Sequence, residues 1–484
     1  MNYRIIGKMV GTVLCIEGLC MLFPLVIAVA DKGSDVPALL ISALICIAVG
    51  YPVSRIRQNN ERIHSRDGFC AAALCWIVLS LFGALPYTLS GTANYVDALF
   101  ETASGFTTTG ATIFAEVEPI PRGLLMWRAL THWMGGMGVL VLALALLPRL
   151  GEGGFNLMCA ESTGPIKTKL KPRLSDTAKT MYAIYVALTA LEILCLCIAG
   201  MPLYDSVAAA FATISTGGFF VHTASIAYYD SLVIHWIIIV FMFLSGINFS
   251  LIFLVLCRRF REAVRNEELW LYTGVTVTFT ALITTALVTM RGVPFVRALT
   301  DAAFQVVALM TTTGFVSADY DLWPNFVRML LFFIMFFGGC AGSTGGGIKH
   351  IRVLILFKGF RRTLRGILHP REVKPVLIDG ERVEEETVTT VFSFFFCYIA
   401  IFLVSAVLFS LFDGLTITES LGTAITAISN VGPAFGAVGP TCNFGFLSNG
   451  SKLLMTLLML MGRLEIMPFF VLAACIFRAK RRTR

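Results

Sequence analysis

Long apolar runs, separated by short polar loops, dominate the hydrophobic pattern of this chain. A helix needs about 20 apolar residues to cross the hydrocarbon core of a bilayer. Ten runs reach roughly that length; they lie near residues 5–30, 36–54, 68–89, 124–147, 180–203, 232–257, 269–290, 326–357, 388–412 and 453–477. The pattern therefore predicts an all-α polytopic membrane protein.

The composition supports this fold class. Of 484 residues, 57% are hydrophobic and 14% are charged, whereas a soluble domain has about 25% charged residues. Ten spans leave room for loops and re-entrant pieces, but not for a large soluble enzyme domain. The 13 cysteines lie mostly in apolar runs and the six histidines form no HExxH motif, so the sequence predicts neither a disulfide scaffold nor a metal or cofactor site.

Basic residues fall mainly on alternate loops. They include Arg57, Arg62, Arg149, Lys167, Lys169, Lys171, Arg173, Arg258, Arg261, Lys358, Arg361, Arg365, Arg371, Arg382 and Arg484. The positive-inside rule then places both termini in the cytoplasm. The net charge of +8 is mostly a topology signal and does not favour nucleic-acid binding, although the inner surface could also contact anionic lipid. Acids gather on the opposite loops and predict an entrance that concentrates cations.

A short polar segment ending in glycine recurs four times between pairs of runs. The copies are Thr107-Thr108-Thr109-Gly110, Ile214-Ser215-Thr216-Gly217, Thr311-Thr312-Thr313-Gly314 and Ser429-Asn430-Val431-Gly432. Each follows an apolar stretch of about ten residues, too short to span a bilayer. These stretches begin at Asp97, Asp205, Asp301 and Glu419. The repeat predicts four re-entrant half-helices whose acids cap their N-terminal ends.

Half-helices whose C-terminal ends meet at one axis would direct partial negative charge and backbone carbonyls at a cation. Such carbonyls can replace the hydration shell of potassium, and glycine allows the backbone angles that turn them inward. The alternative is that each segment is an ordinary polar turn, with its hydroxyls capping the helix. Four copies in matching positions favour the repeat.

Three further motifs accompany the repeat. They are the HWMGGMG sequence at His132 to Gly138, the glycine-rich stretch from Gly338 to Gly347, and Gly462-Arg463-Leu464-Glu465. Over nearly its whole length the chain resembles the Trk/Ktr/HKT superfamily of potassium transporters, and most closely its bacterial TrkH/TrkG membrane subunits. The resemblance implies two leading spans at 1–66, followed by four repeats of span, re-entrant pore helix and span around a pseudo-fourfold central pore. These repeats would occupy 67–150, 151–265, 266–385 and 386–484.

The resemblance also assigns a potassium filter. Its residues would be Thr108, Thr109, Gly110, Ser215, Thr216, Gly217, Thr312, Thr313, Gly314, Asn430, Val431 and Gly432. In plant relatives a serine at the first glycine accompanies sodium transport, so Gly110 implies potassium. The fourth copy has Asn430 and Val431 in place of threonines, which implies an asymmetric filter.

The eighth run is interrupted by a stretch too rich in glycine for a regular helix. Non-helical backbone at membrane depth is tolerated only against protein or a water-filled cavity. The resemblance implies an intramembrane gate formed by Gly338, Gly339, Gly342, Ser343, Thr344, Gly345, Gly346 and Gly347. A helix-packing patch is the alternative. A phosphate-binding loop is disfavoured because His350 follows Lys349, so the GxxxxGK[ST] motif is absent.

Arg463 lies well inside the last apolar run, where a buried charge costs about 3 kcal/mol or more. The resemblance implies that it projects into the pore as an electrostatic barrier to cations. The alternative is an ion pair with an acid such as Glu465, although residues two apart on a helix do not face each other. Arg128 and His132 are interpreted as packing or anchoring residues, and Lys349 as a side chain that reaches the inner interface or senses the gate.

Together these features predict potassium uptake across the bacterial cytoplasmic membrane, with potassium as the transported ligand and no cofactor. The resemblance implies a homodimer and a cytosolic TrkA-like nucleotide-binding regulatory subunit. The basic residues between 349 and 382 offer a docking face for this subunit, and the alternative is that they only determine topology. A symporter that couples potassium to protons or sodium is the alternative. A membrane-embedded enzyme is disfavoured, because ionisable residues within the runs are nearly limited to Glu17, Arg463 and Glu465.

Overall fold

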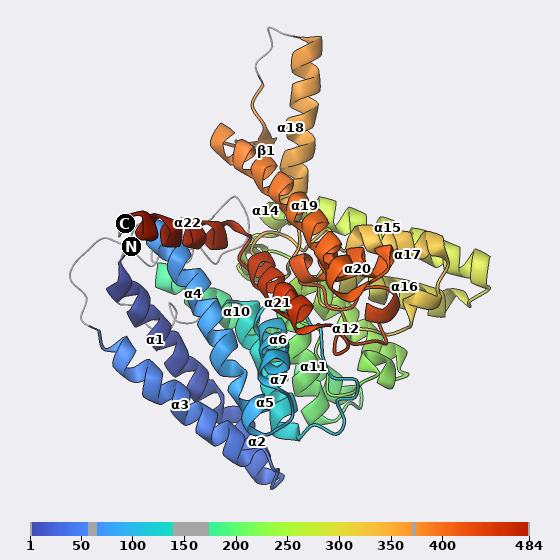
Figure 1. Cartoon of the computed structure of the whole chain (residues 1–484). Helices are drawn as coiled ribbons and strands as arrows, with labels where there is room; N and C mark the ends of the chain where they lie inside the picture. Colours follow the sequence, from blue (N-terminus) through green and yellow to red (C-terminus); the bar gives the residue numbers. More distant parts are fainter. Residues whose placement is uncertain (1, 57–64, 139–173, 370–373, 483–484) are drawn as a thin grey trace.

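Helices make up nearly all of the regular structure (Figure 1), and the computed structural model describes residues 2–56, 65–138, 174–369 and 374–482. Six helices are long and apolar enough to span a membrane, or up to eight if each of two bent pairs is one span. The predicted boundary between 150 and 151 lies outside the described residues, as do Arg57, Arg62, Arg149, Lys167, Lys169, Lys171, Arg173, Arg371 and Arg484.

Two leading spans open the chain and run side by side in Figure 1: α1 (Tyr3–Cys20), continued by α2 (Leu22–Ala30), and α3 (Val36–Ser54). Small residues allow this close approach. A Cβ atom added at Gly11 would lie 2.7 Å from the Gly50 carbonyl oxygen, so the two backbones nearly touch, as small residues permit in membrane helices.

Four units follow, and each places the helix that leads into a repeated glycine segment between two further helices. The first unit contains α4 (Ser65–Gly83), α5 (Leu85–Leu89), α6 (Tyr95–Phe106) and α7 (Arg122–Gly136). The second contains α10 (Leu174–Ile198), α11 (Leu203–Ser215), the 3₁₀ turn Ser225–Tyr228, α12 (Leu232–Ser245), α13 (Phe249–Leu256) and α14 (Phe260–Val264).

The third unit contains α15 (Glu267–Arg291), α16 (Phe295–Met310), the 3₁₀ turn Tyr320–Leu322, α17 (Asn325–Ile334), α18 (His350–Leu368), β1 (Leu377–Ile378) and β2 (Glu381–Arg382). The fourth contains α19 (Glu385–Asp413), α20 (Ile417–Ser429), the 3₁₀ turn Gly436–Val438, α21 (Asn449–Arg463) and α22 (Met467–Arg482). Helices α6, α11, α16 and α20 have 12, 13, 16 and 13 residues. The four predicted half-helices are confirmed.

The predicted capping by acids is correct for only part of the set. In α20, Thr416 and Glu419 form a complete capping box, which satisfies two backbone N–H groups reciprocally. In α16 the prediction is wrong, because this helix already begins at Phe295, after Pro294, and Asp301 therefore lies in its second turn. There Asp301 accepts a hydrogen bond of 3.1 Å from the Nε atom of Arg297.

Three of the predicted spans are broken. The eighth is interrupted as expected, since α17 ends at Ile334 and α18 begins at His350. Two further breaks were not predicted: α12 and α13 meet at 101°, and α21 and α22 meet at 111°. At the first of these the Asn248 side chain accepts from the Ser250 N–H at 2.8 Å and starts a new helix. At the second, Glu465 and Ile466 have φ values of 57° and 68°, which end the helical path.

Helix α18 and the β1–β2 hairpin project from the rest of the molecule (Figure 1). The two strands pair antiparallel, with Leu377 opposite Arg382. Ile355 on α18 packs with Ile378 and with Val388 at the start of α19 in a small apolar cluster of its own. We call α18 with the hairpin the arm.

A substitution at the contact between α6 and α7 tests this packing. A Cβ atom at Gly135 would lie 1.8 Å from the Phe106 carbonyl oxygen, so Gly135→Ala should force the two helices apart and destabilise the protein by about 1–3 kcal/mol. We expect a lower midpoint of thermal unfolding in detergent.

The matched control is Gly274→Ala on α15, where nothing lies within 4 Å of the added atom. Alanine is the better helix former, so this change should leave the midpoint equal or higher. Equal midpoints for both variants would contradict the packing described here.

Candidate functional site

Each half-helix ends in the same backbone turn. The residue that leaves the helix has a left-handed φ in all four copies: 53° at Thr108, 56° at Thr216, 61° at Thr312 and 58° at Asn430. The next residue then donates its N–H to a carbonyl five residues earlier, in the pairs Thr109–Ser104, Gly217–Ala212, Thr313–Ala308 and Val431–Thr426. This is the Schellman arrangement of a helix C-terminus.

A glycine with positive φ closes each turn. These glycines are Gly110 at 81°, Gly218 at 84°, Gly314 at 73° and Gly432 at 102°. Gly217 was predicted for this position in the second copy, but the glycine with positive φ there is Gly218. With this register the acid lies 13 residues before the glycine in every copy, and the Gly218-Phe219 pair matches Gly314-Phe315.

Gly217 is small for a different reason. A Cβ atom at this position would lie 2.4 Å from the His132 ring. His132 is fully buried on α7, and its Nδ1 atom lies 2.7 Å from the Gly105 carbonyl oxygen of α6. It therefore bridges the first half-helix and the second turn, which goes beyond the packing role expected from sequence.

The four turns form a closed ring. A Cβ atom at any of the four glycines would lie within 2.6 Å of a carbonyl oxygen in the next copy. The contacts run from Gly110 to Gly217 O, from Gly218 to Thr313 O, from Gly314 to Val431 O, and from Gly432 back to Thr109 O. We call this arrangement the glycine ring. Each contact joins a ring glycine to the carbonyl of the residue just before the next ring glycine. This repetition gives the chain its pseudo-fourfold symmetry.

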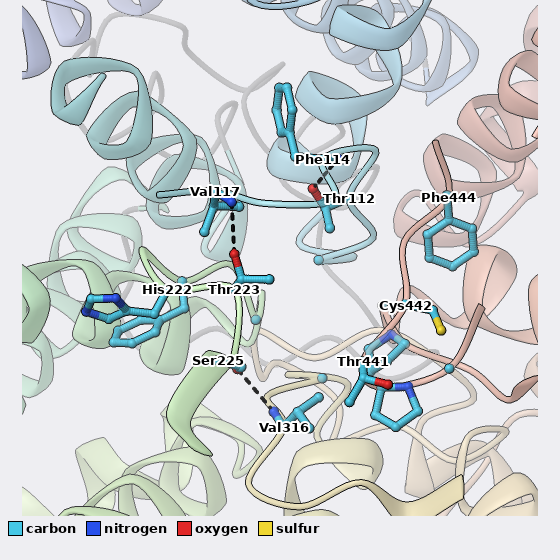
Figure 2. A pocket seen from close by; sticks show the side chains of 18 of the residues that line it. Thr112, Phe114, Val117, His222, Thr223, Ser225, Val316, Thr441, Cys442 and Phe444 are labelled. Carbon is cyan, nitrogen blue, oxygen red and sulfur yellow. Dashed lines mark hydrogen bonds between the residues drawn. The ribbon is translucent and has the colours of Figure 1, made fainter. Parts of the chain in front are cut away.

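A cavity of about 90 Å³ opens on one side of the glycine ring, and all four ring glycines line it. Segments from all four units surround it in Figure 2, including Thr112, His222, Val316 and Cys442. Cross-links between units hold its wall, since the Val117 N–H donates to Thr223 Oγ1 at 2.9 Å and the Val316 N–H donates to Ser225 Oγ at 3.2 Å.

Acids of the expected entrance lie behind the cavity wall and do not form its surface. Among the described residues, no carboxylate lines the cavity. Two acids lie directly behind its wall: Glu118 accepts from the Thr223 N–H at 2.8 Å, and Asp205 lies 2.9 Å from His222 Nε2. Burial raises the pKa of Glu118, but hydrogen bonds from Thr223 outweigh this and lower the pKa below its usual value, so this carboxylate stays ionised at neutral pH.

The glycine-rich stretch lies against the C-terminal ends of the half-helices. Thr344 Oγ1 donates to the Ile214 carbonyl at 3.0 Å, and the Gly346 N–H donates to Thr312 Oγ1 at 2.7 Å. A Cβ atom at Gly346 would also lie 2.3 Å from the Ser429 carbonyl oxygen. The tip of this loop therefore contacts the C-terminal ends of three of the four half-helices.

Arg463 reaches this loop from α21. It is 6% exposed, and its guanidinium donates to the carbonyls of Thr344 and Gly135 at 2.6 Å each. Glu465, the alternative partner considered from sequence, forms an ion pair with Arg352. Arg463 thus places a positive charge beside the loop tip and joins it to the end of α7.

Two more charged side chains hold the loop. Lys349 is 1% exposed, and its Nζ atom donates inward to the Gly345 carbonyl and to Ser343 Oγ, so the expectation that it reaches the inner interface is wrong. Glu268, for which the apolar pattern predicted no role, accepts from the N–H groups of Ala341 at 2.7 Å and Ile351 at 2.9 Å. It therefore ties the two sides of the loop to the first turn of α15.

Comparison with known proteins gives the family. The family model TrkH, described as a cation transport protein, matches residues 36–290 and 266–481. The chain belongs to the TrkH family. It is 37% identical over 482 residues to the Trk system potassium uptake protein TrkH of Escherichia coli strain K12, covering 98% of both chains, and 35% identical to TrkG of the same organism, covering 98% of this chain and 99% of TrkG.

A solved structure agrees over the same length. The crystal structure of the potassium transporter TrkH from Vibrio parahaemolyticus matches with a TM-score of 0.87 and 31% identity, and the match covers 98% of each chain. The TrkH fold of two leading spans and four repeats around a pseudo-fourfold centre is thus shared. The relatives are potassium uptake proteins, which supports potassium uptake and a membrane location for this chain.

The cavity wall offers a direct test of access to the glycine ring. Cys442 is exposed and lines the cavity, so a positively charged methanethiosulfonate reagent added from that side should attach a bulky cation beside the ring. We expect loss of most of the rubidium uptake in proteoliposomes, and partial protection by a high potassium concentration.

The control is Cys442→Ser, whose uptake, compared with its own untreated level, should not respond to the reagent. Complete modification of Cys442, verified by mass spectrometry, with unchanged rubidium uptake would show that ions do not pass through this cavity.

Proposed function

We propose that this chain mediates potassium uptake across a bacterial cytoplasmic membrane through a selectivity filter formed by the glycine ring. The observation that carries this proposal is the closed, fourfold-equivalent set of turns at the ends of α6, α11, α16 and α20. Four helix C-termini contribute partial negative charge, and the carbonyls of the turns can replace water around a dehydrated cation.

In this proposal the filter consists of Thr108 to Gly110, Thr216 to Gly218, Thr312 to Gly314 and Asn430 to Gly432. Ser215 then belongs to the end of α11. The fourth copy compensates for its missing threonines: Asn430 Nδ2 donates to Thr109 Oγ1 at 2.9 Å and to the Met459 carbonyl at 2.8 Å. Its side chain thus joins the fourth copy to the first, which supports a filter that is asymmetric but closed.

The loop from Gly338 to Gly347 serves as the gate in this proposal. Its tip contacts the ends of three half-helices, and the guanidinium of Arg463 lies beside it. Cations that leave the filter would meet both a physical obstruction and a positive charge. Opening requires displacement of the loop, after which a membrane potential of 100 mV drives each ion with about 2.3 kcal/mol.

Assembly extends the same proposal. We place both termini in the cytoplasm and expect a homodimer that binds a cytosolic TrkA-like nucleotide-binding subunit. The arm carries Arg361, Arg362 and Arg365 and would offer part of the docking face. Membrane lipid surrounds the spans, and potassium is the transported ligand.

The test is rubidium or potassium flux into proteoliposomes that contain this chain alone. Flux driven by voltage alone, with potassium preferred over sodium, would support the channel-like mechanism. Flux that requires an opposing proton or sodium gradient would favour the symporter. Absence of flux both for the chain alone and after addition of a nucleotide-loaded regulatory subunit would contradict the proposal.

Serine in place of the first ring glycine tests the filter. At Gly110, where φ is 81°, a Cβ atom would lie 2.2 Å from the Gly217 carbonyl oxygen. Gly110→Ser should displace that carbonyl and raise sodium permeation relative to potassium by roughly tenfold, which corresponds to a loss of about 1.4 kcal/mol of discrimination.

Gly91→Ser is the matched control, since Gly91 also has a positive φ of 74° but no atom lies within 4 Å of the added Cβ. The control should keep the wild-type ratio of sodium to potassium. An unchanged ratio in Gly110→Ser would exclude this glycine from the filter.

Removal of the guanidinium tests the barrier. Arg463→Ala deletes the positive charge beside the loop and its hydrogen bonds to Thr344 and Gly135, so cation flux per folded protein should increase several-fold. Flux is normalised to monodisperse protein in detergent. Folded Arg463→Ala protein with wild-type or lower flux would argue that Arg463 only supports packing.

A further inference from the structure

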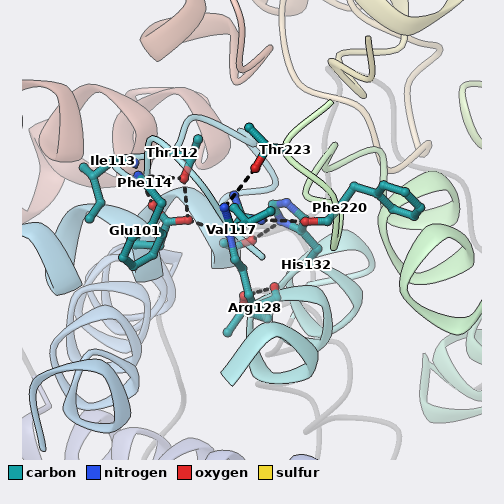
Figure 3. Close-up of polar contacts among 11 residues, drawn as sticks. Glu101, Thr112, Ile113, Phe114, Val117, Arg128, His132, Phe220 and Thr223 are labelled. Atoms are coloured by element: carbon teal, nitrogen blue, oxygen red, sulfur yellow. Dashed lines mark hydrogen bonds and ion pairs between the residues drawn. The ribbon is translucent and has the colours of Figure 1, made fainter. Parts of the chain in front are cut away.

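We propose that a buried ion pair between Glu101 and Arg128 is a positioning element for the filter and helps to set its selectivity. This inference rests on the proposed potassium filter. Glu101 lies on α6 and Arg128 on α7, and their side chains are 0% and 4% exposed. Arg128 Nε lies 2.6 Å from Glu101 Oε1. Figure 3 shows the pair and its partners.

Glu101 holds the chain that leaves the first copy of the ring. Its Oε1 atom accepts from Thr112 Oγ1, and its Oε2 atom accepts from the Ile113 N–H, both at 3.0 Å. These residues follow Gly110 by two and three positions. The carboxylate therefore restrains the backbone directly after the first ring glycine.

Arg128 holds the chain that leaves the second copy. Its Nη1 atom donates to the Phe220 carbonyl at 2.9 Å, and its guanidinium carbon lies 3.6 Å from the centre of the Phe219 ring. These residues follow Gly218 directly. An arginine can make these contacts together because its planar fork donates in several directions, whereas a lysine ammonium is a single point charge.

The pair thus connects two neighbouring copies at their ring contact. Gly110 packs against the Gly217 carbonyl, and the chains leaving Gly110 and Gly218 are joined through Glu101 and Arg128. If either charge is lost, these two chains lose their common support, and the carbonyl between them is free to shift. The spacing of carbonyls decides how well the ring replaces the water of a given cation.

The other copies lack this pair. Glu101 lies nine residues before its ring glycine, and the residues at the same position in the other copies are Ala209, Gln305 and Thr423. Gln305 donates to Ser317 at 3.2 Å within its own unit. Among the described residues, a charged side chain at this position is thus specific to the first copy, which makes the contact between the first and second copies the one to perturb.

A buried ion pair could also serve folding alone, because loss of one partner leaves an uncompensated charge. The experiment therefore measures the ratio of rubidium to sodium uptake, which does not depend on the amount of folded protein. Rubidium and sodium uptake are measured in proteoliposomes for wild type, Glu101→Gln, Arg128→Met and Arg128→Lys. The matched control is Arg122→Met. Arg122 lies on α7, as Arg128 does, but its ion pair with Asp31 is exposed.

We expect Glu101→Gln and Arg128→Met to lower the rubidium to sodium ratio by about tenfold, the equivalent of about 1.4 kcal/mol. Arg128→Lys should have an intermediate effect, and Arg122→Met should keep the wild-type ratio. Folded variants of Glu101 and Arg128 with the wild-type ratio would overturn the inference while leaving the proposed function intact. Absence of cation selectivity in the wild type would instead overturn the proposed function.

If the single variants do not fold, the double variant E101Q/R128Q replaces them. It removes both charges together, so no unpaired charge is buried. A double variant that folds and keeps the wild-type ratio would assign the pair to folding alone, whereas a ratio lowered by about tenfold supports the positioning role.

Discussion

Direct contact between backbones is the constraint on which the rest of this structure depends. At each of the four ring positions a carbonyl oxygen of the next copy lies within 2.6 Å of the place where a Cβ atom would be. Only glycine fits, and it fits only if the four half-helices end at the same depth with the same turn. The membrane helices around them maintain that depth. At Gly135, α7 approaches α6 so closely that a side chain is again excluded.

The turns are also strained. A left-handed φ is unfavourable for any residue with a Cβ atom, and it is rare for β-branched residues. Three of the four copies nevertheless place threonine there, and the fourth places asparagine, which tolerates this conformation better. Such strain persists only where the surroundings hold the backbone firmly. His132, Asn430 and the Gly346 N–H supply some of the hydrogen bonds that do so.

Much of the fold could be predicted because its signals are local. Apolar runs, half-helices and the interrupted eighth span each depend on contiguous residues. The register of the second copy could not be decided locally, because Ser215-Thr216-Gly217-Gly218 offers two glycines. The bends at α12–α13 and α21–α22 fall at short polar segments, Ser245 to Asn248 and Arg463 to Glu465, and the apolar residues on both sides make each run look like one continuous span. Glu101 and Arg128 are 27 residues apart, and Glu268 and Ile351 are 83 apart, so hydrophobic periodicity gives no indication of either contact.

The fourfold ring is built from unequal copies, and a single chain makes this possible. In a homotetramer each stabilising contact would occur at all four interfaces. Here an ion pair within the first unit reaches the second copy through the Phe220 carbonyl, the fourth copy is joined to the first by Asn430, and the third contacts the glycine-rich loop through Thr312. The third unit also carries that loop, and a tetramer with four such loops would bring four tips to one axis. Covalent linkage of the repeats therefore allows a single loop to contact the ends of three half-helices.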